Sequence, residues 1–135
     1  MSADEADAIA MPLILLVEDE ILIRAMVVEA LEEAGFSTLV AGDAQQAVAL
    51  FSGNGHEIRG LVTDINLGDD MDGWELARAA REHASDLPVV YVSGASAHEW
   101  ASQGVPNSLM IIKPFAPAQV VVAISSLLVA SNTMP

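Results

Sequence analysis

The chain has 135 residues and no cysteine, and its nineteen acidic and five basic side chains leave a formal net charge of −14. The length suits one domain with a buried core, and the lack of cysteine excludes disulfides and thiolate metal sites, as is typical of a cytoplasmic protein. The acidic surface predicts repulsion of nucleic acid and of anionic membranes, and every apolar run is shorter than the roughly 20 residues that span a bilayer.

Five short segments rich in apolar and β-branched residues alternate with helical patterns along the chain. We expect strands at Leu13–Val17, Phe36–Val40, Ile58–Thr63, Val89–Val92 and Leu109–Ile112. Apolar residues at helical spacing predict helices at Ile21–Ala34, Ala44–Ser52, Trp74–His83 and Pro117–Ala130, with a shorter one at Ala97–Gln103. Alternation of this kind favours an α/β fold with a doubly wound parallel sheet and helices on both faces.

Several residues mark where the expected helices begin and end. Gly35 occupies the place of a left-handed C-cap after the first helix, Asp43 is the N-cap candidate of the second, and Gly53-Asn54-Gly55 should end the second. The acidic, aperiodic residues 1–11 are expected to form a flexible leader, residues 12–131 the single domain, and residues 132–135 a tail.

Polar side chains follow four of the apolar segments, at the point where each expected strand ends. Glu18 and Asp19 follow the first strand, Asp64 the third, Ser93 the fourth and Lys113, the only lysine, the fifth. Because the carboxyl ends of parallel strands meet at one edge of a sheet, these side chains should lie close together.

The three carboxylates are hard oxygen ligands that suit Mg²⁺, although an acidic pair after a strand can also serve only as a helix N-cap. Asp64 ends an apolar strand and should be the innermost acid, where its carboxylate could act as a nucleophile toward a phosphoryl group. Ser93 could hydrogen-bond one phosphoryl oxygen and Lys113 could pair with another. By itself, Ser93 is better explained as an ordinary turn residue at the end of a strand.

The segments LLVEDE, LVTDINL, VVYVSGAS and IIKPF resemble the four signatures of the receiver domain of bacterial two-component response regulators, over about residues 12–131. The resemblance implies a flavodoxin-like (βα)₅ fold with strand order 2-1-3-4-5. It also implies that Asp64 accepts phosphate from a histidine kinase or a histidine phosphotransfer protein.

The same resemblance assigns roles to neighbouring residues. Mg²⁺ would be bound by Glu18, Asp19, Asp64 and the backbone carbonyl of Asn66. Ser93 and Lys113 would contact the phosphoryl group, Gly94 would keep the acceptor accessible, and the Lys113–Pro114 peptide would be cis.

The sequence departs from the receiver pattern in two places. Met110 stands where receivers usually carry the Tyr or Phe of a rotating switch, although methionine repacks readily. The stretch between Ser93 and Lys113 is short and contains Gly104 and Pro106, so the fourth helix should be stunted. Both features resemble atypical receivers of alphaproteobacteria.

We therefore expect a stand-alone receiver, a monomer or weak dimer, that signals through an unidentified protein partner or a phosphorelay and acts on no separate substrate. A second possibility is that the sequence is a receiver excised from a larger hybrid kinase. One alternative is a pseudo-receiver that is never phosphorylated, and Met110 favours it. Another is a Mg²⁺-dependent phosphatase with an aspartyl nucleophile, which Asp64-Ile65-Asn66 disfavours because Asn66 cannot transfer a proton. The three histidines are expected at the surface: His56, His83 and His98.

Overall fold

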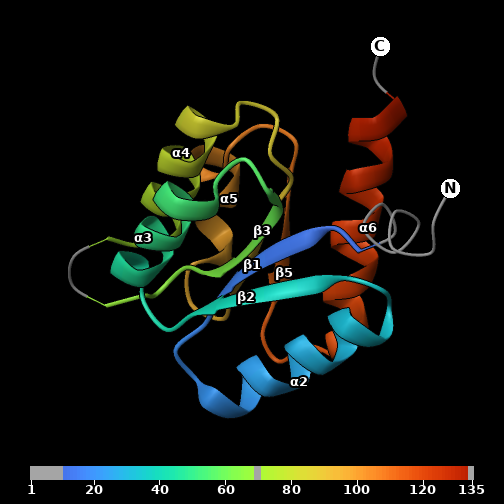
Figure 1. Ribbon diagram of the computed structural model, residues 1–135. Coiled ribbons are helices and arrows are strands. Elements are labelled where there is room, and N and C mark those ends of the chain that lie inside the picture. The colour runs from blue at the N-terminus through green and yellow to red at the C-terminus, as the bar shows by residue number, and fades with distance from the viewer. Residues whose placement is uncertain (1–10, 69–70, 134–135) are drawn as a thin grey trace, which may run out of the picture.

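The computed structural model describes residues 11–68 and 71–133, in which five parallel strands form one sheet in the order β2-β1-β3-β4-β5 (Figure 1). The strands are β1 (Leu13–Val17), β2 (Ser37–Ala41), β3 (Ile58–Asp64), β4 (Val89–Ser93) and β5 (Ser108–Ile112). This confirms the predicted flavodoxin-like fold and its strand order. The expected leader at residues 1–11 lies outside the described residues except for Met11, as do residues 134–135 of the expected tail.

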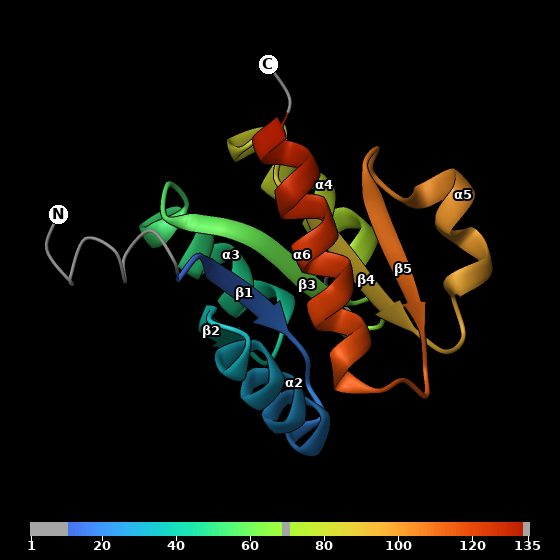
Figure 2. The ribbon, with the colours of Figure 1, turned by 90° about the vertical axis from the view of Figure 1, so that its right-hand side faces the viewer.

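Helices cover both faces of the sheet, α2 and α6 on one face and α3 and α4 on the other (Figure 2). The helical segments are α2 (Ile21–Glu33), α3 (Ala44–Asn54), α4 (Gly73–His83), the 3₁₀ helix η1 (Ala97–Glu99), α5 (Trp100–Gln103) and α6 (Pro117–Thr133). The fourth connection is therefore as short as predicted. No helix in the described ranges is long and apolar enough to cross a bilayer.

The inner strand β1, which lies between β2 and β3, is buried on both faces and separates two hydrophobic cores. Leu15 and Val17 pack with the residues of α3 and α4, whereas Ile14 and Leu16 pack with those of α2 and α6. A strand buried on both sides reads as a continuous apolar run rather than an alternation. The three histidines are exposed, as predicted.

Local signals place most helix ends. The Asp43 side chain accepts a 2.8 Å hydrogen bond from the N–H of Gln46 at the start of α3, and Gly35 has a φ of 98° directly after the C-cap of α2. The second helix ends within Gly53-Asn54-Gly55, as predicted, with Gly55 as its C-cap, but α3 continues through Asn54, two residues beyond the expected Ser52. A helical glycine costs only about 1 kcal/mol, and burial of Phe51 in the core holds the last turns of α3 in place.

Hydrogen bonds to Val105 anchor the segment that carries η1 and α5. The Val105 N–H donates to the hydroxyl of the buried Tyr91 at 3.1 Å, and its carbonyl accepts from Ser108 Oγ at 2.6 Å. The indole N–H of Trp100 donates to the same Ser108 hydroxyl at 3.0 Å. The Tyr91 hydroxyl on β4 thus holds the end of this segment, which is too short to form a full-length helix.

We expect Tyr91→Phe to lower the free energy of unfolding by about 1–3 kcal/mol, because it leaves a buried N–H without an acceptor. Urea unfolding monitored by circular dichroism would measure this as a lower midpoint. Ser126→Ala is the matched control, since the Ser126 hydroxyl only caps an exposed carbonyl of its own helix. Equal midpoints for Tyr91→Phe and wild type would show that this hydrogen bond does not hold the segment.

Candidate functional site

The five polar residues singled out in the sequence meet at the carboxyl edge of the sheet. Glu18 and Asp19 directly follow β1, Asp64 ends β3, Ser93 ends β4 and Lys113 follows β5. Strand order explains the meeting: β1 and β3 are neighbours, as are β3 and β4, and β4 and β5. Residues up to 95 positions apart in sequence, from Glu18 to Lys113, are brought together by this edge.

The ammonium group of Lys113 is the centre of the site. Its Nζ donates to Asp64 Oδ2 at 2.9 Å and lies 3.5 Å from Glu18 Oε1 and 3.6 Å from Glu20 Oε1. Burial by itself lowers the pKa of Lys113, but the hydrogen bond to Asp64 and the surrounding carboxylates outweigh it and raise the pKa above its usual value. The lysine therefore stays charged and neutralises part of the acidic edge.

Glu18 is the most deeply buried acid of the site, with 3% of its surface exposed against 6% for Asp64. The expectation that Asp64 would be innermost was therefore wrong. The backbone N–H of Glu18 donates to the carbonyl of Ala41 on β2, and its side chain folds inward, where Oε2 accepts from the N–H of Glu20 at 3.1 Å. Burial is the main cause that raises the pKa of Glu18 to about 7, and the charge of Asp64 adds to it.

Asp64 has both carboxylate oxygens engaged. Oδ1 accepts from the backbone N–H of Asn66 at 3.3 Å, while Oδ2 carries the bond to Lys113. The main chain at Asp64 is fixed as well, because the Thr63 hydroxyl donates to its carbonyl at 2.8 Å. The Asp64 carboxylate thus has one preferred orientation.

Ser93 is fully buried, and its Oγ accepts from the N–H of Ser96 at 3.0 Å, with no hydrogen bond to Asp64 or Lys113. Gly94 beside it is exposed. The Lys113–Pro114 peptide is cis, as the resemblance implied. Met110 pairs with Tyr91 in the sheet and packs half-buried against the core shared with α3 and α4.

Two residues of the site escaped the sequence reasoning. Glu20 contacts Lys113 and shares an acidic cluster with Glu18 and Asp19, whose carboxylate oxygens all lie within 4.8 Å of one another. Glu20 directly follows Glu18 and Asp19 in the sequence, and this position could have indicated that it belongs to the site. Gly73 was missed as well: its N–H donates to the Ile65 carbonyl at 2.8 Å, so the start of α4 lies against the backbone of the acceptor.

The chain resembles known receiver proteins over most of its length. The family model of the response regulator receiver domain matches residues 14–125. The transcriptional regulatory protein TrcR of Mycobacterium tuberculosis is 31% identical over 121 residues, which cover 88% of this chain and 46% of the relative. The chain thus spans about half the length of the curated relatives it matches.

Solved structures agree with this similarity. A response regulator receiver protein from Sinorhizobium medicae is 40% identical with a TM-score of 0.85, over 90% of this chain and 98% of that one. The chemotaxis protein CheY4 of Vibrio cholerae is 26% identical with a TM-score of 0.77, over 87% of this chain and 99% of that one.

We expect Gly73→Ala to lower the free energy of unfolding by about 1–3 kcal/mol, the usual cost of overpacking. A Cβ at Gly73 would collide with the carbonyl oxygen of Asp64 and would lie 2.8 Å from Ile65 Cα, so the acceptor backbone must shift. Gly53→Ala is the matched control, because nothing lies within 4 Å of a Cβ added at this position. Replacing a helical glycine by alanine should raise the free energy of unfolding by about 0.5–1 kcal/mol. Chemical denaturation measures both, and a neutral Gly73→Ala would contradict the close approach.

A double-mutant cycle tests whether Lys113 stabilises Asp64. Lys113→Gln should be destabilising because it leaves the buried carboxylates without a cation, and adding Asp64→Asn should restore part of the loss, with a coupling of about 0.5–3 kcal/mol. The Glu20 side chain is 61% exposed. The control cycle of Lys113→Gln with Glu20→Gln should therefore give a coupling energy of only about 0–1 kcal/mol. Equal coupling in the two cycles would refute a special role for the Asp64 pair.

Proposed function

The chain belongs to the response regulator receiver family, and from this membership we propose that Asp64 accepts a phosphoryl group from a histidine kinase or a histidine phosphotransfer protein. One observation carries the proposal. The Asp64 carboxylate lies at the carboxyl edge of the sheet among other acids, 2.9 Å from the ammonium of the only lysine. A carboxylate with a neighbouring cation at such an edge is suited to phosphoryl transfer.

In the proposed transfer, an oxygen of Asp64 attacks the phosphorus of a phosphohistidine. The P–N bond breaks, its electron pair remains on the imidazole nitrogen, which takes up a proton, and Asp64 becomes an acyl phosphate. The negative charge that Lys113 neutralises on Oδ2 then passes to the phosphoryl oxygens. The ammonium group of Lys113 then pairs with one of the phosphoryl oxygens instead of with Asp64 Oδ2.

The donor set fits a hard divalent cation. Glu18, Asp19 and Glu20 each offer one carboxylate oxygen, and these three atoms lie within 4.8 Å of one another. Hard oxygens of this kind are ligands that Mg²⁺ accepts. Glu18, Asp19, Asp64 and the carbonyl of Asn66 would hold it, and Glu20 extends the acidic edge. When bound, Mg²⁺ supplies the positive charge that shields the phosphoryl oxygens from these acids.

Ser93 would transmit the change. Its O–H would donate to a phosphoryl oxygen while its Oγ accepts from the N–H of Ser96, the residue that precedes η1. With Met110 in place of an aromatic residue, we propose that phosphorylation repositions the η1–α5 segment rather than rotating a ring on β5. Gly94, exposed beside Ser93, leaves the approach to the acceptor unobstructed.

The proposed partners are proteins: the phosphate donor and a downstream target. A net charge of −14 opposes direct contact of this region with nucleic acid, although curated relatives twice as long are named transcriptional regulators. We propose that the domain acts in the cytoplasm and catalyses no reaction beyond its own phosphorylation and dephosphorylation.

The direct test is intact mass after incubation with acetyl phosphate. We expect wild type to gain one phosphoryl group in the presence of Mg²⁺ and none after chelation with EDTA. Asp64→Asn should gain none, because an amide is not a nucleophile toward phosphorus. Glu82→Gln, an exposed change on α4, is the control that should react as wild type does.

Phosphate gained at the normal level by Asp64→Asn would show that the acceptor is elsewhere. A wild-type chain that neither gains phosphate nor binds beryllofluoride, which mimics the phosphoryl group without turnover, would identify a pseudo-receiver.

A further inference from the structure

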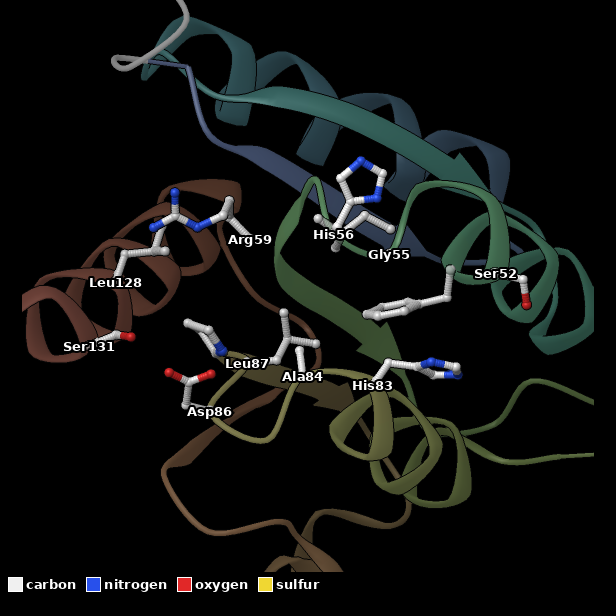
Figure 3. Close-up of a pocket in the computed structure, with 13 residues that line it drawn as sticks. Ser52, Gly55, His56, Arg59, His83, Ala84, Asp86, Leu87, Leu128 and Ser131 are labelled. Atoms are coloured by element: carbon white, nitrogen blue, oxygen red, sulfur yellow. The ribbon is translucent and has the colours of Figure 1, made fainter.

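A cavity of about 440 Å³ lies at the amino-terminal edge of the sheet, opposite the acidic site (Figure 3). It is open to solvent and is lined by the start of β3, the ends of α3 and α4, the connection before β4 and the last turns of α6. Its size falls within the roughly 300–1,000 Å³ of small-molecule sites. Phosphorylation at the other edge makes no use of it.

Arg59 and Asp86 both line this cavity, and within the described ranges neither side chain makes a hydrogen bond or an ion pair. The other cationic side chains of the described residues all donate to oxygen acceptors: Arg24, Arg78, Arg81 and Lys113. Asp86 interacts electrostatically with Arg81, but the hydrogen bonds of the Arg81 guanidinium go to backbone carbonyls and not to Asp86. One positive and one negative side chain, both exposed to solvent, therefore line the same hollow without a hydrogen-bond or ion-pair partner among the described residues.

The backbone at Arg59 is irregular in a way that directs its side chain. Leu13 pairs with Ile58 and Ile14 with Gly60, so Arg59 is an extra residue in β3, a β-bulge. Bulges re-aim a side chain that would otherwise follow the alternation of the strand. In Figure 3 the Arg59 side chain extends from β3 toward Leu128 of α6, across the cavity.

Further polar side chains of the lining come from Ser52, His56, His83 and Ser131, and three helices end beside the cavity. Gly55 caps α3, His83 ends α4 and Ser131 lies in the last turn of α6, and all three line the cavity. Carboxyl ends of helices carry partial negative charge and attract cations. Together with Asp86 they favour a positive group, whereas Arg59 favours a negative one.

The floor between the charged groups is apolar. The side chains of Phe51, Leu87 and Leu128 belong to the buried cores and border the cavity. A ligand that matches this lining carries a carboxylate, an ammonium group and an apolar body. A simple anion such as phosphate would leave the acidic side and the floor without a partner.

We propose that this cavity binds a small apolar α-amino acid as a zwitterion. Arg59 holds the carboxylate, in the bidentate geometry that a guanidinium offers, and Asp86 holds the ammonium beside the helix ends. The apolar side chain lies against Phe51 and Leu87. Such a ligand bridges α3, the connection before β4 and α6 and stabilises the fold by binding only the native state.

The test measures binding of three probes to the full chain by isothermal titration calorimetry and by backbone amide NMR shifts. L-phenylalanine should bind and perturb the amides of Gly55, Arg59 and Leu87. N-acetyl-L-phenylalanine lacks the ammonium and phenethylamine lacks the carboxylate, and each should bind at least tenfold more weakly. Arg59→Gln and Asp86→Asn should each weaken the binding of L-phenylalanine at least tenfold. Arg78→Gln, on α4 outside the cavity, should leave this affinity unchanged.

Equal affinity for the three probes would overturn the zwitterion assignment, since the charges would then play no part. Unchanged affinity in a folded Arg59→Gln, checked by its amide spectrum, would overturn the assigned carboxylate contact. Failure of phenylalanine, leucine and tryptophan alike to bind wild type would overturn the proposal as a whole. None of these outcomes bears on phosphorylation of Asp64, which the acetyl phosphate experiment tests separately.

Discussion

The carboxyl edge of this molecule depends on one ammonium group. Lys113 lies within 3.6 Å of carboxylate oxygens from Asp64, Glu18 and Glu20. Without it, acids at the ends of two adjacent central strands would face one another with little water between them, and charged groups tolerate burial only when paired. In the phosphoryl transfer that we propose, the same ammonium group would pair with the negative charge of the phosphoryl group.

Hydrogen bonds link this edge to the short fourth connection. The Ser93 hydroxyl accepts from the residue before η1, and Tyr91, two positions earlier on β4, fixes Val105 after α5. Both ends of the η1–α5 segment are therefore anchored to one strand. A segment of seven helical residues has little packing of its own, so a change in either hydrogen bond has a large effect on its position. This arrangement offers a physical route for signalling in a chain that has Met110 where a switch aromatic is usual.

Sequence patterns predicted the elements well and the details of their ends less well. β1 matches the expected Leu13–Val17. β3, β4 and β5 each gain one residue at one end, and β2 is shifted by one residue at both ends, because a burial pattern does not show which terminal residue completes a ladder of hydrogen bonds. The second helix was expected to reach only Ser52, but α3 continues through Asn54, because burial of Phe51 outweighs the small helical cost of Gly53. Asp64 was expected to be innermost because it ends an apolar strand, whereas Glu18 is more buried, with its side chain folded onto the backbone N–H of Glu20.

The sequence alone determined the fold, its strand order through the receiver motifs, and the meeting of Glu18, Asp19, Asp64, Ser93 and Lys113 at one edge. Parallel strands impose that meeting, since their carboxyl ends share an edge whatever the side chains do. Only the tertiary structure decided which acids Lys113 contacts, that Gly73 lies against the acceptor backbone, and that Arg59 and Asp86 face one cavity. These depend on distances of a few ångströms between segments far apart in the chain, which no local pattern of residues encodes.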